Sequence, residues 1–193
     1  MKALLTSIIV VSSLNLLSCG DDPSKLSLQE TGTWTKKSDS IIAITFDTLR
    51  SSLAKAIAEG NFEGAINFCR EAAYPLTATY MTPDTKLKRV SDRYRNPANK
   101  PDEKEQSILA AFQDLKDSGK PVDPVLELDK EGNRHYFKPI FVQSLCLNCH
   151  GSRNEQIRPD VWNAIRQRYP SDLAFDYKEG DLRGLWHLSY NKN

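Results

Sequence analysis

Two cysteines and a histidine stand close together in the segment Cys146-Leu147-Asn148-Cys149-His150. A C-x-x-C-H segment is the sequence signature of c-type haem attachment. Each thiol adds across one vinyl group of the haem, and a single helical turn brings both sulfurs within reach of the two vinyl groups. The histidine directly after the second cysteine is then placed as the proximal ligand of the iron. The segment predicts one covalently bound haem c, around which the rest of the chain must fold.

Zinc binding, a disulfide and dithiol redox chemistry are the alternative interpretations of this segment. A structural zinc site needs further ligands, typically a second paired cluster. The remaining candidates, Cys69, His135 and His187, are scattered singly along the chain. A redox C-x-x-C motif needs no histidine in that place, and no thioredoxin-like βαβ pattern precedes the segment. Covalent haem is therefore the favoured interpretation.

The N-terminus predicts export, which haem c attachment requires because it takes place outside the bacterial cytoplasm. A largely apolar run follows Lys2, and the small residue Ser18 stands directly before Cys19. This pattern resembles the lipobox of bacterial lipoproteins, so we expect residues 1–18 to be a signal peptide and Cys19 to be lipidated. An ordinary signal peptide or a membrane anchor is the alternative, but the run is too short and too polar for a comfortable span. We expect a lipoprotein of the bacterial cell envelope, on the periplasmic side or the outer surface, anchored to a membrane through its acyl chains.

Length and charge restrict the class of protein further. Without residues 1–18 the chain keeps 175 of its 193 residues, enough for one domain with a real core. Loss of Lys2 leaves equal numbers of basic and acidic side chains. This balance argues against a nucleic-acid partner.

Hydrophobic periodicity divides the chain into a tether and one domain. Residues 19–37 lack an apolar period and are expected to be a tether, whereas residues 38–193 are expected to fold as a single domain. The elements predicted within the domain are a helix over Asp39–Glu59 ended by Gly60 and Asn61, a helix from Phe62 to about Tyr74 ended by Pro75, a strand over Thr85–Arg95, a helix with Pro101 as its first residue, a hairpin over Val125–Asp129 and Arg134–Val142, a helix opened by Arg158 and Pro159, and a closing strand within Asp176–Tyr190.

The second predicted helix places Cys69 on its inward face, which allows two interpretations. A packed and inert thiol is one, because free cysteine is among the most buried residue types. Coordination of the haem iron as a sixth, thiolate ligand is the other, with His135, His187 and Met81 as competitors. The pattern alone leaves both interpretations open.

Arg89, Arg93 and Arg95 form the densest basic cluster of the chain. Most such charges are simply solvated. A haem, however, brings two propionates that need cationic or amide partners. We therefore treat Arg89 and Arg95 as candidate propionate contacts.

Several segments, in the same order along the chain, resemble the haem-c-binding PAS-like domain family, which occurs alone or on bacterial sensor kinases. The resemblance covers roughly residues 40–190 and implies an α/β fold of the α+β kind, with a PAS-like antiparallel sheet flanked by helices. It also implies axial ligation of a covalent haem c by His150 and Cys69. The segments that carry the resemblance are Ala65-Ile66-Asn67-Phe68-Cys69, Arg95 to Glu103, Tyr136-Phe137-Lys138-Pro139-Ile140, Leu145 to Gly151, Tyr169-Pro170-Ser171-Asp172 and Gly180 to Gly184.

Ligation by imidazole and thiolate predicts a six-coordinate, low-spin haem with a low reduction potential. Because both axial positions would be filled, this argues against peroxidase or oxygenase chemistry, and no catalytic residue set stands out elsewhere. We expect a single-electron carrier that meets a redox partner protein in the envelope. The alternatives are a haem-based redox or gas sensor that acts through a separate partner and a haem enzyme with an open iron site. Dimerisation, common among PAS-like domains, is a further expectation.

Overall fold

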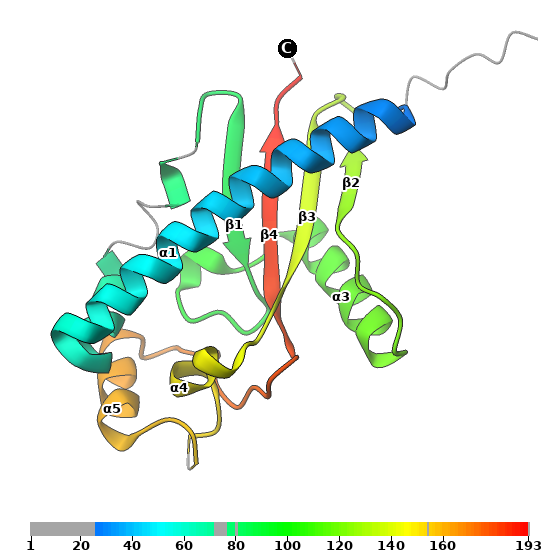
Figure 1. Cartoon of the computed structure of the whole chain (residues 1–193). Coiled ribbons are helices and arrows are strands. Elements are labelled where there is room, and N and C mark those ends of the chain that lie inside the picture. The colour runs from blue at the N-terminus through cyan, green and yellow to red at the C-terminus, as the bar shows by residue number, and fades with distance from the viewer. Residues whose placement is uncertain (1–25, 72–76, 80, 154, 193) are drawn as a thin grey trace, which may run out of the picture.

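The computed structural model describes residues 26–71, 77–79, 81–153 and 155–192. Its centre is an antiparallel sheet in the strand order β1-β4-β3-β2. The last strand of the chain therefore lies between β1 and β3 (Figure 1). The sheet and its flanking helices form a single α+β domain, which confirms the predicted fold class. The strands are β1 (Thr85–Val90), β2 (Val125–Leu128), β3 (Arg134–Phe141) and β4 (Leu182–Tyr190).

The central strand β4 supplies side chains to both faces of the sheet, because successive residues of a strand point to opposite sides. Trp186, Leu188 and Tyr190 pack on one side against α1 (Leu28–Glu71). Leu185 packs on the other side against α3 (Glu103–Asp117). Figure 1 shows α1 running diagonally across one face, with α3 on the opposite face. The predicted hairpin is confirmed as β2 and β3, which pair antiparallel.

Helix α1 begins at Leu28, so the predicted tether does not extend to Lys37. The early turns of the helix are held by the sheet: the ring of Trp34 lies 4.7 Å from that of Tyr190. The Ser38 hydroxyl lies 3.0 Å from the Tyr190 hydroxyl. Tertiary contacts of this kind stabilise helices that local pattern does not reveal.

The break predicted at Gly60 and Asn61 appears as a kink inside α1. Asn61 has a left-handed φ of 54°, and its side chain accepts a hydrogen bond from the Glu63 backbone at 2.8 Å. The helical segment after the kink changes direction and carries Cys69. It is described as far as Glu71, so the predicted end at Pro75 lies outside the described residues, as do the predicted signal peptide and Cys19.

Two predicted boundaries differ from those in the structure, one at the end of β1 and one at the start of α3. Strand β1 ends at Val90 rather than Arg95, because the Ser91 backbone donates to the Asn99 carbonyl and the chain leaves the sheet in a loop. The next helix starts at Glu103 rather than at Pro101, because Asp102 caps it in a reciprocal capping box with Glu105.

In the described part of the chain three helices follow β3, and the first two contain the C-x-x-C-H segment. They are η2 (Ser144–Cys146), α4 (Leu147–His150) and α5 (Pro159–Arg168). A further short 3-10 helix, η1 (Pro97–Asn99), lies between β1 and α3. Backbone hydrogen bonds from Asp176 to Gly151 and from Tyr177 to His150 fasten this region to the segment that leads into β4. No helix among the described residues has the length and apolar character needed to cross a membrane.

The packing of β4 yields a first prediction. Leu188→Ala is expected to lower the free energy of unfolding by about 2–5 kcal/mol, because it deletes fully buried methyl groups in the middle of the sheet. Chemical denaturation followed by circular dichroism measures this change. Leu28→Ala, at a side chain that is 94% exposed, is the control and should leave stability unchanged. Equal losses in the two variants would contradict the central position of β4.

Candidate functional site

A cavity of about 640 Å³ lies between the kinked helix α1, strand β1 and the C-x-x-C-H segment. Ligand pockets for small molecules and cofactors fall in this size range. Its walls are mainly apolar, and every free cysteine of the described chain lines it, together with His150. The apolar lining includes Phe46, Leu49, Leu53, Ile57, Phe62, Ala65, Ile66, Phe68, Leu87, Ile140 and Leu145.

The two cysteines of the C-x-x-C-H segment lie on successive helical turns, η2 and α4. Cys146 packs beside the cluster of Val142, Ala174 and Tyr177. Cys149 packs beside a second cluster that contains residues of α5. Burial raises the pKa of the Cys149 thiol to about 11. Both cysteines line the same cavity, and the Cys149 thiol stays neutral near pH 7.

The ring of His150 is oriented by one hydrogen bond. Its Nδ1 lies 2.7 Å from the Ala174 carbonyl oxygen, which can only accept, so Nδ1 carries the proton. Burial and the positive charges of Arg95 and Arg183 lower the pKa of His150 well below its ordinary value. The neutral ring then keeps its lone pair on Nε2, the atom free to coordinate a metal.

Cys69 reaches the cavity from the part of α1 that follows the kink, and thus from a distant part of the chain. Burial raises the pKa of its thiol, while the positive charges of Arg89 and Arg95 act in the opposite direction. An anionic sulfur here needs a strong positive partner, such as a metal ion. The structure thus brings the sequence candidates Cys69, Cys146, Cys149 and His150 to one cavity.

Arg95 has a structural role that its sequence context does not reveal. Its Nη2 donates to the carbonyls of Cys149 at 2.6 Å and Ala174 at 3.0 Å. The same guanidinium pairs with the buried carboxylate of Asp172 at 3.1 Å. Arg95 lines the cavity, but these contacts direct it toward the loop that holds the C-x-x-C-H segment.

Arg89 lines the cavity without a charged partner. Its guanidinium lies 5.4 Å from the ring centre of Trp186, and it has no hydrogen-bond or ion-pair partner among the described residues. Burial lowers its pKa, since the low-polarity surroundings disfavour its charge. Arg93 lies outside the lining and stacks on Tyr177 instead.

Sequence reasoning missed Arg183 as a site residue. It lines the cavity, and its Nη1 donates to the Ser91 hydroxyl at 2.8 Å and to the Arg93 carbonyl at 3.2 Å. Burial lowers the pKa of this guanidinium as well. An arginine next to a glycine near the start of β4 was the available signal.

The competing ligand candidates separate into two groups. Met81 lines the cavity, whereas His135 and His187 lie on the opposite side of the sheet, toward α3. Within the described ranges, no group of three or more His, Cys, Asp and Glu side chains is arranged to hold a metal ion. The zinc interpretation therefore finds no ligand set in this part of the chain.

Comparison with known proteins assigns the family. The model of the Tll0287-like family matches residues 29–190, most of the chain. The chain belongs to the Tll0287-like family. It is similar to the crystal structure of the cyanobacterial heme-protein Tll0287, with 27% sequence identity and a TM-score of 0.57. That match covers 87% of this chain and 98% of the other. No protein with curated annotation matches the sequence.

The contacts of Arg95 predict a large effect of its removal. Arg95→Gln should lower the free energy of unfolding by about 3–5 kcal/mol, because it leaves the carboxylate of Asp172 buried without its partner. Thermal or chemical denaturation measures the loss. The matched control is Arg158→Gln, which removes an exposed pair with Asp160 and should not change stability measurably. If the two variants behave alike, Arg95 does not hold the loop.

Proposed function

We propose that the chain binds one haem c through thioether bonds to Cys146 and Cys149 and transfers single electrons. The observation that carries this proposal is the meeting of Cys69, Cys146, Cys149 and His150 at one apolar cavity. Two of these groups have the spacing of haem attachment, and the other two are potential axial ligands. Membership in the same family as a haem protein of closely similar length supports it.

The residues around the cavity fit a haem. The group is large, flat and apolar except at its propionates, and the lining is apolar over most of its extent. The thiols of Cys146 and Cys149 are free of disulfides, as thioether formation requires. His150 offers Nε2 because Nδ1 is occupied by Ala174. A bound haem supplies a one-electron Fe(III)/Fe(II) couple.

Cys69 is proposed as the second axial ligand. Its sulfur lines the cavity from α1, whereas His150 reaches the cavity from α4. An anionic sulfur stabilises the ferric over the ferrous state and so lowers the reduction potential. The nearby positive charges of Arg89 and Arg95 support a thiolate at this position. With histidine in one axial position and thiolate in the other, the site would suit electron transfer better than reactions that need an open coordination position on the iron.

Arg89 and Arg183 are proposed to pair with the propionates. Both guanidinium groups line the cavity, and neither forms an ion pair with a carboxylate among the described residues. Burying a charge without a partner is costly, so an anionic ligand group that enters the cavity would relieve that cost. Arg95 is the weaker candidate because Asp172 already compensates its charge.

The proposed carrier works at a membrane of the bacterial envelope, anchored through Cys19, and passes electrons to a redox partner protein. The edge of the cavity near Cys146 supports such an encounter. Phe141 and Leu145 line the cavity there and also stay 38% and 52% exposed. Exposed apolar side chains beside a cofactor form a surface suited to brief docking of a partner.

The proposal predicts distinct spectra for ligand variants. The full chain and its Cys69→Ala variant would be produced with a haem c maturation system and compared by absorption spectroscopy. The wild type should be low-spin in both oxidation states. In Cys69→Ala the ferric spectrum should change and the reduction potential should rise, because the anionic ligand is lost.

The matched control is Met81→Ala, which removes the other sulfur that lines the cavity and should leave the ferric spectrum unchanged. An unchanged spectrum in Cys69→Ala would contradict thiolate ligation. Rapid binding of carbon monoxide by the reduced wild type would favour a gas sensor over a carrier. A chain that acquires no haem at all would overturn the proposed function.

A further inference from the structure

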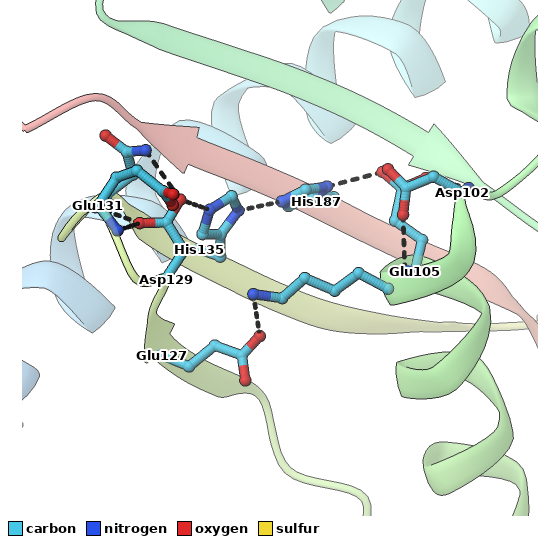
Figure 2. A network of polar contacts seen from close by, with 9 residues as sticks. Asp102, Glu105, Glu127, Asp129, Glu131, His135 and His187 are labelled. Atoms are coloured by element: carbon cyan, nitrogen blue, oxygen red, sulfur yellow. Dashed lines mark hydrogen bonds and ion pairs between the residues drawn. The ribbon is translucent and has the colours of Figure 1, made fainter. Parts of the chain in front are cut away.

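A second set of titratable side chains lies on the α3 face of the sheet, away from the cavity. Asp129, His135, His187 and Glu105 form a continuous row from the turn after β2 across β3 and β4 to α3 (Figure 2). The separations along the row are 3.1 Å from Asp129 Oδ2 to His135 Nε2, 2.9 Å from His135 Nδ1 to His187 Nε2, and 2.7 Å from His187 Nδ1 to Glu105 Oε1. None of these residues lines the cavity.

Three hydrogen bonds in this row need three hydrogens. Two neutral histidines bring only two, one on each ring. If each ring donates its single proton to the carboxylate beside it, the facing atoms His135 Nδ1 and His187 Nε2 are both unprotonated. Two lone pairs would then meet at 2.9 Å, which is repulsive.

Neither carboxylate is placed to supply the missing hydrogen. Burial raises the pKa of Glu105, but hydrogen bonds from His187, Lys88 and the Asp102 backbone outweigh it and lower that pKa to about 2. Burial also raises the pKa of Asp129, and hydrogen bonds from Asn133 and His135 again outweigh it and lower that pKa. Both groups are therefore ionised near neutral pH.

We infer that the His135–His187 pair is a built proton-binding site, which in the folded protein holds one proton more than two neutral rings carry. The pair then shares three protons among four ring nitrogens and has one positive charge. The ligand of this site is the proton, and the two flanking carboxylates are its fixed counter-charges.

The charges around the pair favour this extra proton. His187 and Glu105 are both buried, so little solvent screens their interaction. Among the charged groups that face the pair, four carboxylates stand against two ammonium groups. These groups come from β1 (Lys88), from α3 and its N-cap (Asp102, Lys104, Glu105), from β2 (Glu127) and from the turn after β2 (Asp129).

The site couples folding to pH in a defined direction. Unfolded histidines lose their proton above about pH 6.5, whereas the folded pair keeps one. Folding therefore takes up a proton at higher pH, and stability falls as the pH rises. On the acid side, stability that depends on Glu105 is present above its ordinary pKa of 4.5 and is lost as the pH falls toward about 2.

Nuclear magnetic resonance of the full chain tests the proton count directly. The chain has three histidines, of which His150 belongs to the cavity, so ¹⁵N-histidine labelling leaves two further rings to assign. In the reduced protein at pH 7, the ring ¹⁵N chemical shifts of His135 and His187 should show that three of their four ring nitrogens are protonated. A result of two protonated nitrogens would overturn the inference.

A pH series of unfolding gives an independent test. Between pH 7.5 and 8.5 the unfolding equilibrium constant of the wild type should rise, by up to about tenfold per pH unit, relative to that of His135→Phe, which leaves His187 with one acceptor and removes the need for the extra proton. Phe137→Leu, which alters a ring stacked on His187, should keep the wild-type slope. Equal slopes in wild type and His135→Phe would contradict the inference. Should His135→Phe fail to fold, the proton count of the wild type decides alone.

Discussion

The position of His150 depends on one backbone atom, the carbonyl oxygen of Ala174. This oxygen accepts hydrogen bonds from His150 Nδ1 and from Arg95 Nη2. Arg95 in turn binds the Cys149 carbonyl and the Asp172 carboxylate. The segment before β4 is therefore the support that holds the C-x-x-C-H segment in place. Because a histidine can present only one lone pair, fixing Nδ1 fixes which atom faces the cavity.

The two faces of the sheet have separate tasks in this structure. The α1 face and the end of the sheet carry the apolar cavity, where burial raises the pKa of the Cys69 and Cys149 thiols. Two arginines of its lining, Arg89 and Arg183, form no ion pair with a carboxylate of the described residues. The α3 face carries the row from Asp129 to Glu105, where polar groups satisfy one another. Strand β4 connects the two, with Arg183 in the cavity lining and His187 in the row. One face is arranged for a cofactor and the other for a proton.

Local chemistry accounts for what could be predicted from the sequence. The spacing of Cys146, Cys149 and His150 indicates haem attachment because that chemistry needs a single turn of helix. Alternation and turn residues identified the hairpin and the closing strand, and the glycine–asparagine pair marked the kink in α1. These signals lie within a few residues of each other, so no knowledge of the tertiary structure was needed.

Tertiary contacts account for what could not be predicted. The start of α1 depends on Trp34 packing against Tyr190, far along the chain. The structural role of Arg95 depends on carbonyl groups more than fifty residues away. In the row on the α3 face, His135 and His187 meet only because β3 and β4 pair in this register. None of these contacts produces a periodic pattern of residue types in the sequence.

The central claim is that this cavity holds a haem bound covalently at Cys146 and Cys149. The most direct measurement is the intact mass of the denatured full chain after production with a haem c maturation system. The account predicts a chain heavier by one haem, and no added haem when both cysteines are replaced by serine. A wild-type chain with no covalently retained haem would contradict the account.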